Sequence, residues 1–152
     1  MNLAVAEGRT ERIAAAYEFL AALYQDAPAA HLALFTVPGE KSHWLLSGDL
    51  SAIAERAVDL SETCDTYFSI GLHSARPTKG RGLASGVRAI PGFWIEIDIA
   101  HPCHASASLP RGLEDVHSLL GAFPYPPSWI VHSGHGVHAW WLFPEPWTFD
   151  SE

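Results

Sequence analysis

Residues 92–100, GFWIEIDIA, constrain the fold more than any other stretch, because every second side chain along them is apolar. Alternation with a period of two is typical of a β-strand whose two faces meet different surroundings. One face carries two acids, Glu96 and Asp98, next to Trp94. The other face is apolar and consists of Phe93, Ile95, Ile97 and Ile99. The stretch therefore predicts one strand of a β-sheet.

The two acids are unusual in such a strand, since a buried charge is costly without an ion pair or a metal. Side chains two residues apart on a strand lie about 6.6 Å from each other, so both carboxylates can reach one metal ion or a pair of ions. Oxygen ligands suit the hard cations Mg²⁺ and Mn²⁺, which serve phosphoryl chemistry. An ordinary half-exposed strand with its polar face towards water shows the same pattern, so the acids alone leave both interpretations open.

The remaining elements predict a single α+β domain over residues 1–152. Its largely antiparallel sheet has helices packed on one face. A helix over residues 10–25, capped by Thr10, precedes two strands joined by a turn around Pro38 and Gly39. The later elements, in chain order, are a helix at 49–62, strands at 66–73 and 92–100, a helix at 113–123 and a hairpin at 128–143.

Composition places the chain among folded proteins, with 48% hydrophobic and 17% charged residues. No apolar run reaches the length of a membrane span, and the N-terminus lacks the layout of a secretory signal. The two cysteines do not indicate a disulfide framework. We therefore expect a cytoplasmic protein without a membrane partner.

The net charge of −8 argues against a broad electrostatic grip on nucleic acid. Four of the nine basic residues nevertheless fall in one glycine-containing loop, between residues 74 and 91. Two interpretations stay open for this loop, a solvated flexible segment or a phosphate-facing segment beside an active site. The four residues are Arg76, Lys79, Arg81 and Arg88.

The hairpin sequence VHSGHGVHAWW, residues 131–141, predicts a turn that can bind phosphate. Gly134 and Gly136 allow positive φ and a close approach of ligand to backbone. Exposed amides, the Ser133 hydroxyl and an imidazole together form a nest for phosphate oxygens. If this hairpin pairs beside the acidic strand, phosphate-binding groups and metal ligands face one another.

The two stretches together resemble the archaeo-eukaryotic primase superfamily, in particular the primase-polymerase domains of plasmids, phages and integrated elements. FWIEIDIA is similar to that family's first motif, two acids one residue apart on a strand. PPSWIVHSGHGVHAWWLFPEPW is similar to its second motif, a Ser-Gly-x-Gly-x-His hairpin often followed by aromatic residues and a Glu-Pro pair. The resemblance covers residues 65–147 or so.

The resemblance implies an RRM-like catalytic core for DNA-directed nucleotidyl transfer during replication of a plasmid, phage or mobile element. Nucleoside triphosphates and a DNA template are then the partners, with a fused or associated helicase as a further one. Glu96, Asp98 and His138 are the implied catalytic residues, and the two acids bind Mg²⁺ or Mn²⁺. The implied nucleotide-binding residues are Ser133, Gly134, His135, Gly136 and His138, with Arg76, Lys79, Arg81 and Arg88 steering template or triphosphate.

Three departures from the family pattern qualify this expectation. Glu96 stands where Asp is commoner, and His135 stands where a basic residue such as Arg is frequent. The family's third motif is an acid on a strand beyond the hairpin, for which this chain offers Asp150, Glu145 and Glu152. We therefore expect the chain to be the N-terminal part of a longer protein and incomplete as an enzyme.

Three other functions remain open. A catalytically incomplete nucleotide- or nucleic-acid-binding module of the same fold retains the acids and the hairpin. A structural domain that recruits a helicase needs neither. A zinc site is the third alternative, although zinc needs four ligands in tetrahedral geometry. Its candidate ligands are His101, Cys103 and His104, and His132, His135 and His138, with His132 and His138 as cross-strand neighbours in a hairpin centred on His135.

Overall fold

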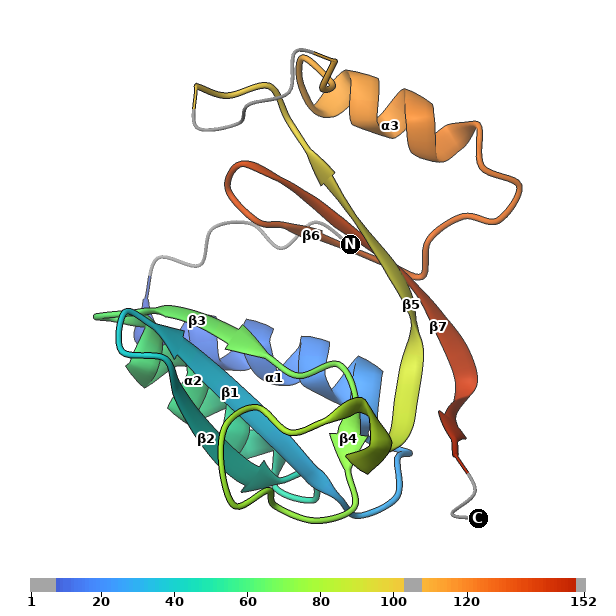
Figure 1. Cartoon of the computed structure of the whole chain (residues 1–152). Coiled ribbons are helices and arrows are strands. Elements are labelled where there is room, and N and C mark those ends of the chain that lie inside the picture. The colour runs from blue at the N-terminus through green and yellow to red at the C-terminus, as the bar shows by residue number, and fades with distance from the viewer. Residues whose placement is uncertain (1–7, 103–107, 150–152) are drawn as a thin grey trace. The chain divides into compact units, whose positions relative to one another are not determined.

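The computed structural model describes residues 8–102 and 108–149. It has three α-helices and seven strands, which form a largely antiparallel sheet, and this confirms the α+β class (Figure 1). The helices are α1 (Arg9–Tyr24), α2 (Leu50–Ser61) and α3 (Leu113–Gly121). The strands are β1 (His31–Val37), β2 (Lys41–Leu46), β3 (Asp65–Phe68), β4 (Leu72–His73), β5 (Val87–Asp98), β6 (Trp129–His132) and β7 (Gly136–Thr148).

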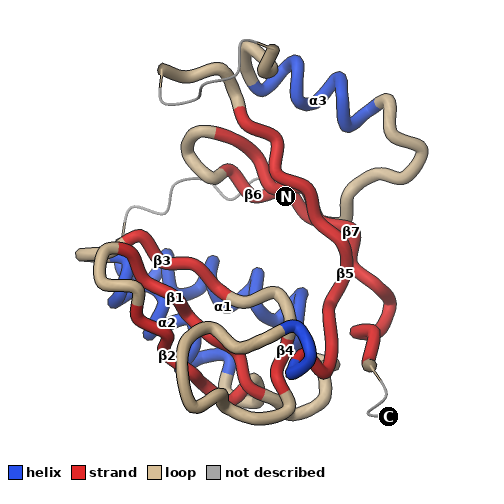
Figure 2. The backbone as a smooth tube through the Cα atoms, viewed as in Figure 1, coloured by secondary structure: helices blue, strands red, loops and turns tan. Residues whose placement is uncertain are grey.

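The strands pair in the order β2-β1-β4-β5-β7-β6, and β3 also pairs with β1 (Figure 2). The predicted strand over 66–73 is two strands, because the chain leaves β1 after Phe68 and returns to it at His73. The acidic strand begins at Val87, so Arg88 lies in β5 and not in the preceding loop. These two differences correct the sequence prediction.

The described residues fall into two compact units. The N-terminal unit comprises residues 8–91 and 143–149, and the hairpin unit comprises residues 92–142 without 103–107. Strands β5 and β7 contribute one part to each unit. The single domain over residues 1–152 stays a prediction.

In the N-terminal unit, α1 and α2 lie together on one face of β1, β2 and β3 (Figure 1). Helix α1 begins at Arg9 with Gly8 as its N-cap, and the Glu11 carboxylate accepts a hydrogen bond of 2.8 Å from the Gly8 amide. Thr10 is therefore inside the helix and does not cap it. The buried hydrophobic residues of this unit include Leu20, Leu23, Leu32, Leu34, Ile53 and Val58.

Tyr24, the last residue of α1, joins the C-terminal end of that helix to the chain between β3 and β4. Its side chain is buried, and its hydroxyl lies 3.1 and 3.0 Å from the carbonyl oxygens of Ser69 and Ile70. Burial raises the pKa of Tyr24, because a phenolate in this environment loses its hydration. The hydroxyl thus stays neutral and serves as a hydrogen-bond donor to the chain between β3 and β4.

The hairpin unit has its own small core on one face of its three strands. Val116 and Leu120 of α3 pack on Ile97 of β5 and on Val137 and Ala139 of β7. The spacing of four residues places both α3 side chains on one face of that helix. Alternation along β5 therefore buries the predicted apolar face at Ile97 and leaves the face of the acids away from α3.

The opposite face of the N-terminal unit's sheet, away from α1 and α2, contains a buried histidine. His73 is 5% exposed, pairs with His31 across β4 and β1, and contacts the Trp44 ring edge-on at 5.0 Å between centroids. A Cβ at Gly86 would lie 3.0 Å from its Nδ1, so the chain after β4 covers the ring closely. Burial lowers the pKa of His73, and the nearby charge of His31 lowers it further.

This depressed pKa predicts a loss of stability in acid. Between the ordinary pKa of histidine and the lower folded value, the unfolded chain binds more protons, so stability falls as the pH drops through that window. We expect urea unfolding to give a lower free energy at about pH 5.5 than at about pH 7.5. In a His73→Gln variant, the free energy of unfolding should differ less between the two pH values. An unchanged difference would assign the effect to His43, because burial lowers the pKa of that residue as well.

Candidate nucleotide- and metal-binding site

Three strands of the hairpin unit place the predicted acids beside the predicted hairpin. Strand β7 lies between β5 and β6. The Nε2 atom of His138 on β7 lies 3.3 Å from Oε1 of Glu96 on β5. A Cβ at Gly136 would lie 3.2 Å from the Cα of Asp98. Glu96 is therefore next to His138, and Asp98 is next to Gly136.

These contacts also identify the face on which the site lies. Strand side chains alternate, so Glu96 and His138 share the face opposite Ile97, Val137 and Ala139, which pack on α3. This face opposite α3, which carries Glu96, Asp98 and His138, is called the open face. The Glu96 side chain is 62% exposed and the His138 side chain 32% exposed, while Asp98 is half-buried. Neither carboxylate is therefore fully buried. This corrects the premise that both charges need an ion pair or a metal for the fold to be stable.

The turn between β6 and β7 presents its backbone next to the end of β5. Gly134 has a φ of +96°, a conformation that favours glycine, and the Ser133 amide donates to the Gly136 carbonyl at 3.0 Å. The Ile99 amide donates to the His135 carbonyl at 2.9 Å. Ser133, Gly134 and His135 are exposed. The turn thus offers an exposed hydroxyl and an exposed imidazole beside the strand that carries the two acids.

The structure brings together seven of the residues singled out in the sequence within one unit. The face opposite α3 carries two carboxylates, and Mg²⁺ is commonly held by one or two carboxylates together with substrate phosphates and waters. Among residues 8–102 and 108–149, no group of three or more His, Cys, Asp or Glu side chains is arranged to hold a metal ion. The seven residues are Glu96, Asp98, Ser133, Gly134, His135, Gly136 and His138.

The hairpin register separates two of the histidines that a zinc site would need, His132 and His138. His132 pairs with Val137, and His138 pairs with Val131, so His132 and His138 are not cross-strand partners and lie on opposite faces. The predicted centring on His135 is wrong, because the turn has two residues, Gly134 and His135, between its hydrogen-bonded ends Ser133 and Gly136. Cys103 and His104 lie outside the described residues. The ring of His101 lies 4.3 Å from that of His135 between centroids.

Of the candidates for a third acid, Glu145 alone lies within the described residues. Glu145 is exposed on the part of β7 that belongs to the N-terminal unit. Asp150 and Glu152 lie outside the described residues.

The four basic residues of the predicted loop belong to the N-terminal unit and have different neighbours. The Arg81 guanidinium lies over the Phe35 ring, 4.6 Å from its centroid, between two glycines of positive φ. Arg76 lines a cavity of about 530 Å³ next to β2 and α2. Lys79 is exposed. A cation above an aromatic ring is typical of a packed side chain, so Arg81 has a structural contact that the sequence did not predict.

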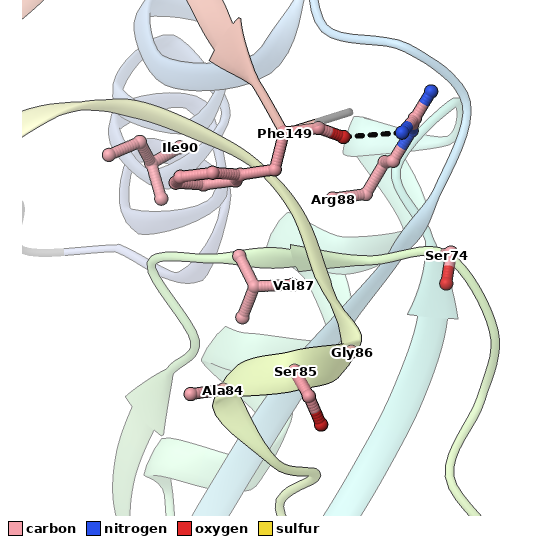
Figure 3. A pocket seen from close by; sticks show the side chains of 8 residues that line it. All are labelled: Ser74, Ala84, Ser85, Gly86, Val87, Arg88, Ile90 and Phe149. Carbon is pink, nitrogen blue, oxygen red and sulfur yellow. Dashed lines mark hydrogen bonds between the residues drawn. The ribbon is translucent and has the colours of Figure 1, made fainter. Parts of the chain in front are cut away.

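Arg88 lines a cavity of about 630 Å³. Figure 3 shows its guanidinium directed at the carbonyl oxygen of Phe149, to which it donates a hydrogen bond. The Phe149 amide in turn donates to the Arg88 carbonyl at 2.8 Å. Arg88 therefore ties the end of β7 to β5, a role that the interpretation as a phosphate-binding residue did not include.

One residue of the open face was not singled out as functional. The Trp94 indole stacks on that of Trp140, with centroids 5.8 Å apart and planes at 25°. The alternation of residues 92–100 already placed Trp94 on the face of the acids. Its position next to a buried indole depends on the pairing of β5 with β7, which the sequence alone did not reveal.

Comparisons of the chain with protein-family models, with curated proteins and with solved structures found no match. Within the described part of the chain, no helix has the length and apolar character needed to cross a membrane.

Proposed function

We propose that the chain is part of the catalytic domain of a DNA primase-polymerase with an RRM-like core, which joins nucleotides from nucleoside triphosphates on a DNA template. The observation that carries the proposal is the pairing of β5 with β7, which sets Glu96 3.3 Å from His138 and places the glycine-containing turn beside Asp98. An acidic pair next to a glycine-containing turn is the arrangement that the two sequence motifs predict.

Each residue has a distinct part in this proposal. Glu96 and Asp98 hold Mg²⁺ or Mn²⁺. When bound, the cation neutralises charge on the triphosphate and activates the attacking oxygen. Ser133 and the exposed amides of the turn bind phosphate oxygens. His138 orients the Glu96 carboxylate through its Nε2 contact and hydrogen-bonds a phosphate oxygen. Positioning and electrostatics then account for most of the catalysis.

The first test is calorimetric titration of the protein with dATP in the presence of Mn²⁺ and again with excess EDTA. We expect saturable binding that disappears with EDTA, because the carboxylates repel a bare triphosphate and bind it only through the cation. Binding that survives EDTA, or no binding in either condition, contradicts the proposal. Release of pyrophosphate on a primed template would then show polymerase activity, whereas its absence is equally expected of a chain that is incomplete as an enzyme.

A further inference from the structure

A row of three tryptophans crosses the open face of the hairpin unit. Trp94 of β5 stacks on Trp140 of β7, and Trp140 is the cross-strand partner of Trp129 on β6. Trp140 is 1% exposed and Trp129 is partly buried, whereas Trp94 is 46% exposed. Trp94 is therefore the member of this row whose ring is most open to a ligand.

The contact with the buried Trp140 makes the Trp94 ring a preorganised stacking surface. Its indole lies on a ring that is itself held in the interior, with planes at 25°, so stacking a further ring on the outer side requires little additional ordering. Aromatic pairs favour such offset stacking, and exposed aromatic side chains are common stacking surfaces for nucleic acid bases. The apolar core of the unit lies on the opposite face, against α3, and does not need this ring.

The order of groups along the strands indicates which ligand fits. Asp98 lies beside Gly136, Glu96 beside His138, and Trp94 beside Trp140, in three successive rows spaced by about 6.6 Å. Phosphate-binding groups of the turn are therefore at one end, the acids are in the middle and an aromatic platform is at the other end. A nucleoside triphosphate fits this order, with its phosphates at the turn and at the cation held by the acids, and its base at the aromatic end.

We propose that Trp94 is the base-stacking residue of the nucleotide site, with the triphosphate directed to the turn around Gly134 and the nucleobase lying on the Trp94 indole. This assignment rests on the proposed function, because it takes the position of the phosphates from it. It adds a contact to the base, which neither sequence motif contains. The contact is independent of hydrogen bonds to base edges, so the site accepts all four bases, and purines stack with the larger area.

The test compares a ligand that has a base with one that lacks it. The protein is titrated with dATP and with inorganic tripolyphosphate, each with Mn²⁺, as wild type and as Trp94→Leu. Stacking on an aromatic side chain is worth roughly 1–3 kcal/mol per base, so Trp94→Leu should weaken dATP binding at least about fivefold. Binding of tripolyphosphate should not change. Trp94→Phe keeps a ring and should retain most of the affinity for dATP.

The matched control is Phe93→Leu, which alters an aromatic residue that is 63% exposed on the opposite face of the same strand. It should leave the affinity for both ligands unchanged. Equal weakening of dATP and tripolyphosphate in Trp94→Leu would show a structural role and overturn the assignment, as would unchanged dATP binding. A wild type that binds tripolyphosphate but gains nothing from the base overturns the assignment alone, whereas a wild type that binds neither ligand overturns the proposed function as well.

Discussion

Asp98→Asn is expected to weaken Mn²⁺-dependent nucleotide binding at least about tenfold while the chain stays folded. Asparagine has nearly the same shape as aspartate and retains one oxygen, but it lacks the charge that a hard cation requires. Asp98 is half-buried on the open face, whereas the core of the unit lies on the other face against α3, so the substitution does not disturb packing. Titration with dATP and Mn²⁺ should show an affinity at least tenfold lower, about 1.4 kcal/mol or more.

The matched control removes the same charge from the opposite face of the same unit. Glu114 is exposed in the first turn of α3, and Glu114→Gln changes the net charge by the same amount as Asp98→Asn. Its effect on nucleotide affinity should be small, because exposed charges at a distance are screened by salt. Equal losses in both variants would mean that net charge governs binding. Full affinity in Asp98→Asn would remove Asp98 from the metal site.

The hairpin unit was predictable where its periodicity is strong. Alternation along residues 92–100 correctly separated Ile97 from Glu96, because one face must be buried and a strand has only two faces. The glycines of the turn likewise located the bend between β6 and β7, since a φ of +96° at residue 134 favours glycine. The expected pairing of this hairpin beside the acidic strand agrees with the contacts between β5 and β7.

Register and loop contacts were not predictable in the same way. A shift of one residue in the hairpin register changes the cross-strand partner of His138 from His132 to Val131. The turn sequence allows either register. The contacts of Arg81 with Phe35 and of Arg88 with Phe149 join residues far apart in the chain. Composition marked both arginines as available for phosphate. It carried no information on the aromatic ring and the carbonyl oxygen that they meet, because such contacts depend on tertiary packing.

The second large effect is expected from Gly136→Ala. Strands β5 and β7 approach so closely at this point that a Cβ at residue 136 would lie 2.6 Å from the Ile97 carbonyl oxygen and 3.2 Å from the Asp98 Cα. These are backbone atoms, so the strands themselves must separate. Overpacking of this kind costs roughly 1–3 kcal/mol. Urea unfolding should show a loss in this range, and dATP binding should weaken as well, because Asp98 and His138 are held together by the same pairing.

Gly121→Ala is the control, because a Cβ at the end of α3 meets nothing within 4 Å. Alanine is also the better helix former, so the free energy of unfolding should stay the same or rise by a few tenths of a kcal/mol, up to about 1 kcal/mol. A Gly136→Ala variant as stable as Gly121→Ala would contradict the close approach of β5 and β7. A variant that is destabilised but binds dATP with full affinity would separate the strand pairing from the site. Glycine at 136 would then be required by the fold alone, and the resemblance of the hairpin to a phosphate-binding motif would rest on Ser133 and Gly134.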